Sequence, residues 1–163
     1  MEDILKKYSN YTAASPNQDL SDLVSQGWDC MEQRRPDYKC AYKYNLEAFK
    51  MAHPEGAVNI GIIFERKGDF EQNRIGNDKN ALSDFVMAYK WFKLSMKNNN
   101  LHSADGELGV IRLVLKTCKI KNDCHYRVNK LKTWLLKDAL GAARNNALNP
   151  SWKQHKNDFL RSI

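Results

Sequence analysis

A four-residue motif occurs twice in this chain, first as Ala41-Tyr42-Lys43-Tyr44 and again as Ala88-Tyr89-Lys90-Trp91. A glycine follows each copy: Gly61 comes 20 positions after Ala41, and Gly109 comes 21 positions after Ala88. Internal repetition at this scale is typical of stacked supersecondary units, since each unit buries its apolar face against the next. We therefore expect a repeat architecture rather than an enzyme pocket that is built once.

Gly27 is a third glycine of the same kind, and the spacing of the three locates an insertion. Gly27 and Gly61 are 34 positions apart, whereas Gly61 and Gly109 are 48 positions apart. The additional residues fall between Gly61 and Ala88. The predicted organisation of the single domain is a set of repeats at about 20–53, 54–101 and 102–140, with an insertion at 69–84.

Apolar residues recur at helical spacing along most of the chain, and strand-like alternation is absent. Helices are expected from about Leu20 to Gly27 and over 38–51, 55–67, 85–96, 104–116, 126–140 and 150–160. Pro54 marks the start of the helix at 55–67, and Gly68 marks its end. The sequence therefore predicts an all-α fold, a short α-solenoid of about three helix hairpins plus a C-terminal helix.

The repeat glycines are expected inside helices, where glycine costs up to about 1 kcal/mol relative to alanine. Because this cost recurs once per repeat, we infer that each glycine allows close approach of a partner helix. Ala41 and Ala88 are the small residues expected to face them.

These features resemble the Sel1-like repeat, a relative of the tetratricopeptide repeat. Its first helix reads small-x-x-x-aliphatic-Gly-x-x-aromatic, and its second reads Ala-x-x-aromatic. The residues of the second unit that match are Gly56, Ile60, Gly61, Phe64, Gly68, Ala88, Trp91 and Phe92. The outer units match in part, with Cys30 and Arg112 standing where the pattern has an aromatic residue. The resemblance covers about residues 20–140 and implies a protein-binding scaffold.

Basic residues are concentrated towards the C-terminal end. Residues 1–111 carry 14 Lys and Arg against 16 Asp and Glu, whereas residues 112–163 carry 12 against 3. Such asymmetry indicates a polyanion or an acidic protein partner, or else a solvated face of the terminal helices. The basic residues are not interleaved with exposed aromatics, as they are in single-strand nucleic-acid platforms. We therefore expect a protein partner and keep nucleic acid as the alternative. No apolar run is long enough to span a membrane.

Four cysteines, Cys30, Cys40, Cys118 and Cys124, bracket two predicted turns. A helix hairpin can bring Cβ atoms to the roughly 4 Å that a disulfide needs, so two disulfides are one interpretation. Buried reduced thiols are the other, and the absence of Cys-x-x-Cys disfavours zinc. Disulfides favour the periplasm or secretion, which is the location that we expect. The lack of an apolar signal segment in residues 1–15 makes the cytoplasm the alternative.

No catalytic motif is found: the sequence has no phosphate-binding Gly-rich loop, no His-Glu-x-x-His and no Gly-x-Ser-x-Gly. We therefore expect no catalysis, no cofactor, no metal and no small-molecule substrate. His53 and His102 occupy similar positions after the second helix of successive repeats, which indicates a shared structural role.

Two surfaces are candidates for binding a partner protein. The residue after each repeat glycine is apolar, and these residues either line the concave groove or fill the seams between the first helices of successive repeats. They are Trp28, Ile62 and Val110, with Arg66 and Arg112 beside them as charged anchors. The second candidate is the insertion, interpreted as a polar loop, with Glu71 and Arg74 on it and Glu65 close by.

The function expected from these patterns is non-enzymatic protein binding. A short repeat domain with one elaborated segment suggests a dedicated partner, as for a bacterial inhibitor or immunity protein that occludes a toxin or effector. An adaptor in secretion or at the envelope is a second form of the same hypothesis. The alternative is nucleic-acid or polyanion binding through the basic C-terminal third.

Overall fold

The computed structural model describes residues 2–7, 18–97, 102–122, 125–137, 145 and 151–162. Within these ranges the chain is helical and contains no strand, which confirms the predicted all-α class. The elements are α1 (Glu2–Lys7), α2 (Gln18–Met31), α3 (Tyr38–Lys50), α4 (Gly56–Phe70), the π-helical turn η1 (Glu71–Ile75), α5 (Asp78–Met96), α6 (Ser103–Lys121), α7 (His125–Lys137) and α9 (Trp152–Ser162). None of these helices is both long enough and apolar enough to cross a membrane.

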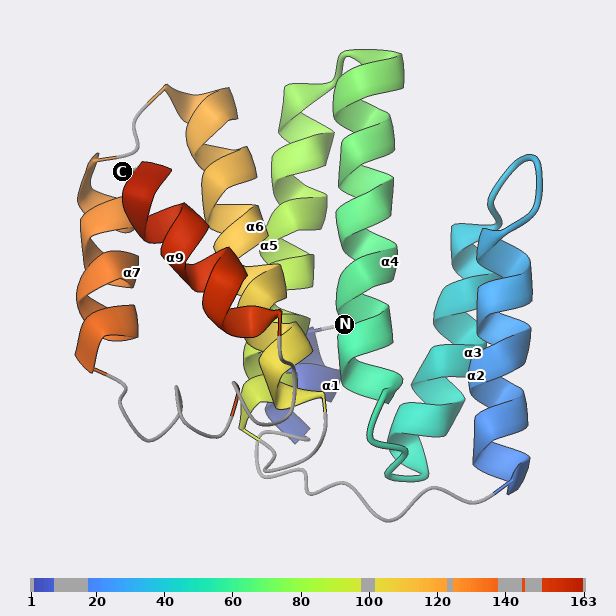
Figure 1. Ribbon diagram of the computed structural model, residues 1–163. Coiled ribbons are helices and arrows are strands. Elements are labelled where there is room, and N and C mark those ends of the chain that lie inside the picture. Colours follow the sequence, from blue (N-terminus) through green and yellow to red (C-terminus); the bar gives the residue numbers. More distant parts are fainter. Residues whose placement is uncertain are drawn as a thin grey trace.

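From α2 to α6, each helix packs against the one that follows it (Figure 1). Helices α2 and α3 form a hairpin at one end of the molecule, α4, α5 and α6 stand side by side, and α7 lies beyond α6. Helix α4 also contacts α6 directly, so α5 is offset to one side of both. Helix α9 packs against α6 and runs obliquely to it.

Two helix starts are fixed by side chains that accept hydrogen bonds from the first turn. The carboxylate of Asp37 accepts from the backbone N–H of Cys40 at 2.9 Å, at the start of α3. The side-chain oxygen of Asn77 accepts from the backbone N–H of Asn80 at 3.0 Å, at the start of α5. Such caps satisfy backbone donors that the helix itself leaves without partners.

The segment 69–84 is not a loop, so that expectation is wrong. Helix α4 continues through Gly68 to Phe70, and η1 extends it to Ile75. Gly76 then adopts the left-handed conformation, with φ of 73°, and α5 begins two residues later. The additional residues therefore lengthen both helices of the α4–α5 hairpin. Only Gly76 and Asn77 remain to connect the two extended helices.

Gly68 was expected to end α4, but it lies inside the helix and has a packing role. A Cβ at this position would lie 2.5 Å from an atom of the Phe85 ring on α5. Glycine is therefore needed here for close approach between two helices and not for a helix terminus.

The main core lies between α3, α4, α5 and α6 and receives side chains from α7. Its fully buried large members are Phe49, Ile60, Phe85, Trp91, Phe92 and Leu113. Phe92 of α5 lies against Gly61 of α4 and Gly109 of α6, and a Cβ on either glycine would come within 2.6 Å of its ring. The predicted close approach is confirmed, although a phenylalanine, not an alanine, faces these two glycines.

The α2–α3 hairpin has a smaller apolar cluster of its own, formed by Cys30, Met31 and Ala41 together with Ile63 of α4. A disulfide joins Cys30 to Cys40, with their Cα atoms 5.9 Å apart. This confirms one of the two predicted bridges.

The second predicted bridge lies only partly within the described residues. Cys118 is buried on α6, whereas Cys124 lies outside them. The expectation of a second disulfide therefore stays a prediction.

Candidate functional site

Six of the predicted partner-binding residues lie on three helices, α2, α4 and α6, and four of the six pair directly across the helix boundaries. Trp28 of α2 meets Arg66 of α4, and Glu65 of α4 meets Arg112 of α6. Ile62 lies one helical turn before Arg66 and is half-buried against the main core. We call the surface formed by Trp28, Ile62, Glu65, Arg66, Asp69, Arg112 and Lys116 the α2–α4–α6 face.

At one end of this face, the guanidinium carbon of Arg66 lies 5.3 Å from the centre of the Trp28 ring. Arg66 is exposed and Trp28 is half-buried, so the arginine covers the ring and keeps its own polar edge in water. A cation over an indole is attracted by the negative face of the ring. The pair joins α2 to α4 and places an aromatic ring and a positive charge side by side at the protein surface.

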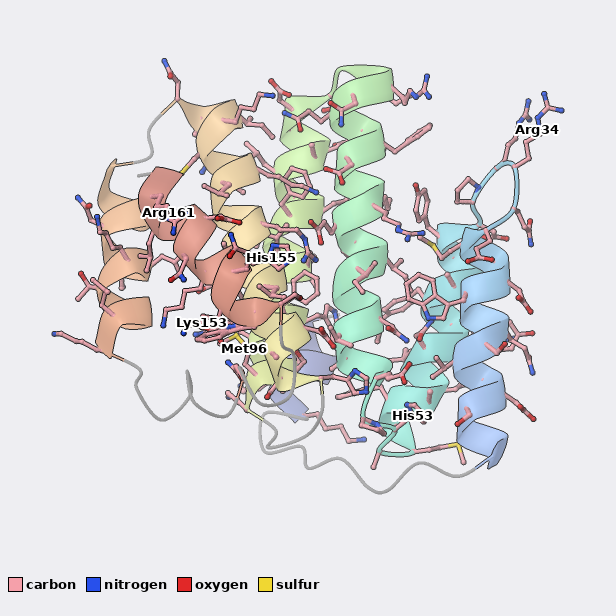
Figure 2. The ribbon with its side chains drawn as sticks, in the orientation of Figure 1. Arg34, His53, Met96, Lys153, His155 and Arg161 are labelled. Carbon is pink, nitrogen blue, oxygen red and sulfur yellow. A yellow bond between two sulfur atoms is a disulfide. The ribbon has the colours of Figure 1, made fainter. Side chains whose placement is uncertain are left out.

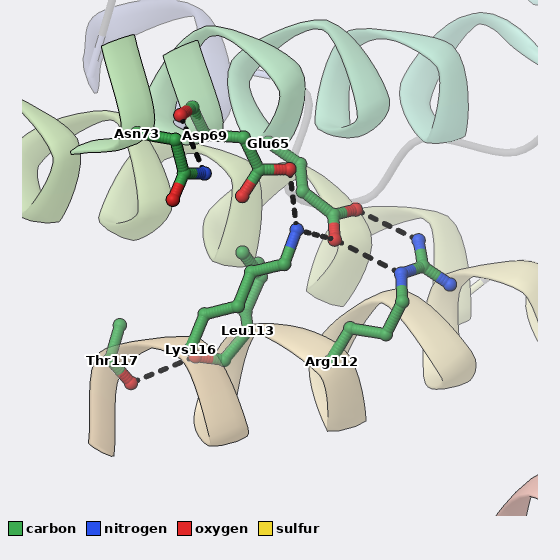
Figure 3. A network of polar contacts seen from close by, with 7 residues as sticks. All are labelled: Glu65, Asp69, Asn73, Arg112, Leu113, Lys116 and Thr117. Atoms are coloured by element: carbon green, nitrogen blue, oxygen red, sulfur yellow. Dashed lines mark hydrogen bonds and ion pairs between the residues drawn. The ribbon is translucent and has the colours of Figure 1, made fainter. Parts of the chain in front are cut away.

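At the other end, two carboxylates of α4 face two cations of α6 (Figure 3). Arg112 donates from Nε to one oxygen of Glu65 at 3.0 Å and from its terminal nitrogen to the other oxygen at 2.8 Å. Lys116 donates to Glu65 at 2.8 Å and to Asp69 at 2.7 Å. The two negative and two positive charges cancel. On each helix the two charged residues are four positions apart, a spacing that places them on one side of the helix.

The Glu65 side chain is only 6% exposed, and the ionised state of its carboxylate depends on its two partners. Burial alone raises the pKa of Glu65, but hydrogen bonds and charge from Arg112 and then Lys116 outweigh burial and hold the pKa below its usual range. Burial lowers the pKa of Arg112, but the hydrogen bond and charge of Glu65, together with the charges of Asp105 and Asp69, outweigh burial and raise this pKa overall. Both groups are therefore charged at neutral pH, and the bidentate geometry is that of a strong charge-assisted pair.

The same cations also cover the aromatic core. Arg112 lies 5.8 Å from the centre of the Phe92 ring, and Lys116 lies 5.7 Å from that of Phe85. The Arg112 side chain is nevertheless 47% exposed. It therefore closes the seam between α4 and α6 and still presents part of its guanidinium to solvent.

The three apolar residues that follow the repeat glycines do not form a continuous stripe. Trp28 and Ile62 are partly exposed, but Val110 is buried and belongs to the main core. Its helix places it on the side that faces α5 and α7. Val110 is therefore a core residue, and it does not extend the partly exposed pair of Trp28 and Ile62.

Glu71 and Arg74 lie on η1, at the tip of the extended α4–α5 hairpin. Asn80 donates a long hydrogen bond of 3.5 Å to Glu71, and Arg74 is exposed. Below them, Lys67 of α4 pairs with the buried Asp84 of α5 at 2.8 Å. The tip is therefore held by an ion pair at its base.

Asp69 and Lys116 complete the charge network, although sequence reasoning did not select either one. Each lies four residues after a residue that it did select, Glu65 and Arg112. That spacing was available as a signal, because residues four apart share one side of a helix. It could not show that the two sides face each other, since this follows from how α4 and α6 pack.

His53 and His102 make polar contacts at the turns that precede α4 and α6, respectively. The backbone N–H of Glu55 donates to Nδ1 of the buried His53 at 3.1 Å. His102 lies 3.6 Å from the Glu55 carboxylate and 3.3 Å from that of Asp105. Burial lowers the pKa of His53, opposed by Glu55 and assisted by His102.

Within the described ranges, no group of three or more histidine, cysteine, aspartate or glutamate side chains is arranged to hold a metal ion. Comparison of the chain with protein-family models, with curated proteins and with solved structures finds no match.

Proposed function

We propose that this chain is a Sel1-like α-solenoid of about three helix hairpins that binds another protein and catalyses no reaction. The sequence motifs support the repeat assignment, as does the equivalent use of Gly61 and Gly109, both of which pack against Phe92. The sequential packing of α2 to α6 supports the solenoid.

The observation that carries the binding proposal is the composition of the α2–α4–α6 face. Tryptophan and arginine contribute most often to the energy of protein interfaces, and here they lie together as Trp28 and Arg66, 5.3 Å apart. Arg112 adds a second, half-exposed guanidinium on the next helix. All three side chains project from helices and not from loops, so a partner would find them ordered in advance, with little entropy lost on binding.

The mechanism would be occlusion, in which the face covers a functional surface of the partner. A toxin or effector that the chain inhibits, or an envelope component to which it adapts, fits this mechanism. The disulfide between Cys30 and Cys40 supports a periplasmic or secreted location, because such bonds persist in oxidising compartments. A cytoplasmic location is the alternative.

The test begins with proteins encoded beside this one, co-expressed with it and assayed for a complex by calorimetry. In a complex so found, Arg66→Ala and Trp28→Ala should each weaken binding at least tenfold, the effect of losing one well-buried contact. Lys153→Ala is the matched control, since Lys153 is an exposed residue of α9, a helix that contributes no residue to the face (Figure 2), and it should leave the affinity unchanged.

Two outcomes would contradict the assignment to this face. In the first, an Ile62→Ala/Arg66→Ala double variant binds as tightly as the parent chain. In the second, Glu71→Ala or Arg74→Ala removes binding while the face variants retain it, which would assign the interaction to the tip of the α4–α5 hairpin.

Polyanion binding through the C-terminal helices is the second candidate. Lys153, His155 and Arg161 of α9 are exposed (Figure 2), and residues 112–163 carry a large excess of basic over acidic side chains. A salt titration with duplex DNA separates the two candidates. Phosphate binding weakens steeply as ionic strength rises, whereas binding through aromatic and paired side chains changes little.

A further inference from the structure

A cavity of about 540 Å³ lies between α5, α6 and α7. Its inner wall is formed by Phe85 of α5 and by Val110 and Leu113 of α6, all of which are buried. Leu131 of α7 lines it from the third helix. A cavity of this size, lined mainly by apolar side chains, has the properties of a small-molecule site.

The outer wall of the cavity contains large apolar side chains that the chain itself leaves exposed. Val86 is 48% exposed and Tyr89 is 40% exposed, and both line the cavity from α5. They lie three residues apart, so they share one side of the helix. A ligand that lies along this side would remove apolar surface from water, which is the main favourable term in such binding.

The two charged side chains of the described lining are both basic. Lys93 from α5 and Lys130 from α7 both line it and are both exposed, and no acidic residue belongs to its described lining. The two ammonium groups come from helices on different sides of the cavity. An anionic head group placed between them would be attracted by both, while an ammonium head group would be repelled.

We propose that this cavity binds a long-chain carboxylate, an amphiphile with one acyl chain and one anionic head group. The acyl chain lies along Phe85, Val86 and Leu113, and the carboxylate lies between the ammonium groups of Lys93 and Lys130. The site is on the side of α5 and α6 that faces α7, so it is independent of the α2–α4–α6 face. It adds a bound ligand, not a substrate, to the function proposed above.

The experiment uses the full chain after lipid extraction, with palmitate titrated as a monomer and detected by displacement of a fluorescent fatty acid. Palmitate should bind saturably at one site per chain. Val114→Trp, which fills the cavity from α6, should weaken this binding at least tenfold. Leu115→Trp is the matched control, since Leu115 is the next residue of the same helix, is 39% exposed and does not line the cavity; it should bind as the parent does.

A second comparison tests the head group. Lys93→Gln/Lys130→Gln should weaken palmitate binding at least tenfold, and Lys119→Gln, an exposed change on α6, should not. The hexadecyltrimethylammonium cation, which carries an acyl-length chain and the opposite charge, should bind much more weakly than palmitate to the parent protein.

Three outcomes would overturn the proposal: no saturable binding of palmitate, equal binding of the cationic amphiphile, or palmitate binding that Val114→Trp leaves unchanged. Thermal unfolding of each variant shows whether it is folded. If Val114→Trp unfolds early, Val86→Trp replaces it, because Val86 is half-exposed at the opening and tolerates a larger side chain without disturbing the core.

Discussion

The α2–α3 hairpin and the α4–α6 unit both consist of neighbouring helices in contact, but different interactions hold them. The main core of α4, α5 and α6 surrounds Phe92 and is closed by the Glu65–Arg112–Lys116–Asp69 network. The hairpin has a small cluster of buried residues and a disulfide. A helix pair at the end of a stack has one neighbour fewer, so it buries less apolar surface, and a covalent bond can supply part of the difference.

The comparison also separates the roles of polar groups in the two regions. In the hairpin, Asn45 donates to the carbonyl of Ala41 beside Gly27 and accepts from Asn59 of the neighbouring helix α4, so neutral amides satisfy one another there. In the α4–α6 unit, one of the buried polar groups is the charged Glu65, whose two partners are both cations. Burying a carboxylate is costly unless it is paired and hydrogen-bonded. The central unit should therefore be more sensitive to the loss of one charge than the hairpin is to the loss of one amide contact.

The largest expected effect is that of Phe92→Ala in the central unit. The Phe92 side chain is fully buried between two glycines, and its removal should lower the free energy of unfolding by about 3–5 kcal/mol, the usual cost of a large core cavity. Phe70→Ala is the control, because Phe70 is 45% exposed at the end of α4. Urea unfolding measures both, and equal losses would show that the core is not centred on Phe92.

Removal of the disulfide should be the next largest effect and should act on the hairpin. The ring closed by Cys30 and Cys40 spans a sequence separation of 10, and the entropy of closing a loop of this length corresponds to about 2–3 kcal/mol. In Cys30→Ala/Cys40→Ala, hydrogen exchange should rise in α2 and α3 before it rises in α5. A uniform rise over all helices would show that hairpin and central unit unfold as one.

Arg112→Met tests the charge network. It leaves Glu65 buried with Lys116 as its remaining partner, and because Arg112 is half-exposed the loss should be about 2 kcal/mol, below the value for a fully buried pair. Arg161→Met is the matched control, since Arg161 pairs with Asp158 at 3.9 Å on the surface of α9 and should change stability by less than about 0.5 kcal/mol. Equal effects in urea unfolding would mean that the network contributes no more than a surface pair.

The smallest expected effect concerns pH. The folded state holds the pKa of His53 below its usual value of 6.5, so the unfolded chain binds a proton first as pH falls. The contribution of His53 is therefore present above about pH 6.5 and is lost as pH decreases below it, by at most about 1.4 kcal/mol per pH unit.

Unfolding measured between pH 7.5 and pH 5 checks this sign. His53→Gln should flatten the dependence, and His155→Gln, on the exposed surface of α9, should retain it. Stability that rises as pH falls from 6.5 would contradict the burial argument for His53.

Local patterns in the sequence predicted several elements closely and others in part. Helix α3 was expected at 38–51 and runs over Tyr38–Lys50. Helix α5 was expected at 85–96 but begins at Asp78, where Asn77 caps it. The prediction began too late because the apolar pattern is weak over the first turns of this helix. The polar composition of 69–84 suggested a loop, yet polar residues also form the exposed side of an extended hairpin. Composition alone does not distinguish these two cases.

The candidate site, like the helices, was predicted only in part from the sequence. Arg112 was selected from the sequence as a charged anchor beside a groove and Glu65 as a neighbour of the insertion, but their direct pairing across 47 positions was not predicted. Asp69 and Lys116 were missed, and Val110 proved to be buried. Each of these results depends on which sides of α4, α5 and α6 meet.

The sequence by itself determined that this chain is helical and where its glycines permit close packing, because periodicity and the missing Cβ act within a few residues. Only the tertiary structure decided that Phe92 occupies the space beside Gly61 and Gly109, that Glu65 finds its cations on α6, and that a cavity remains beside α7. Those outcomes depend on the rotation and distance between helices far apart in the sequence. They are set by the packing of many side chains at once.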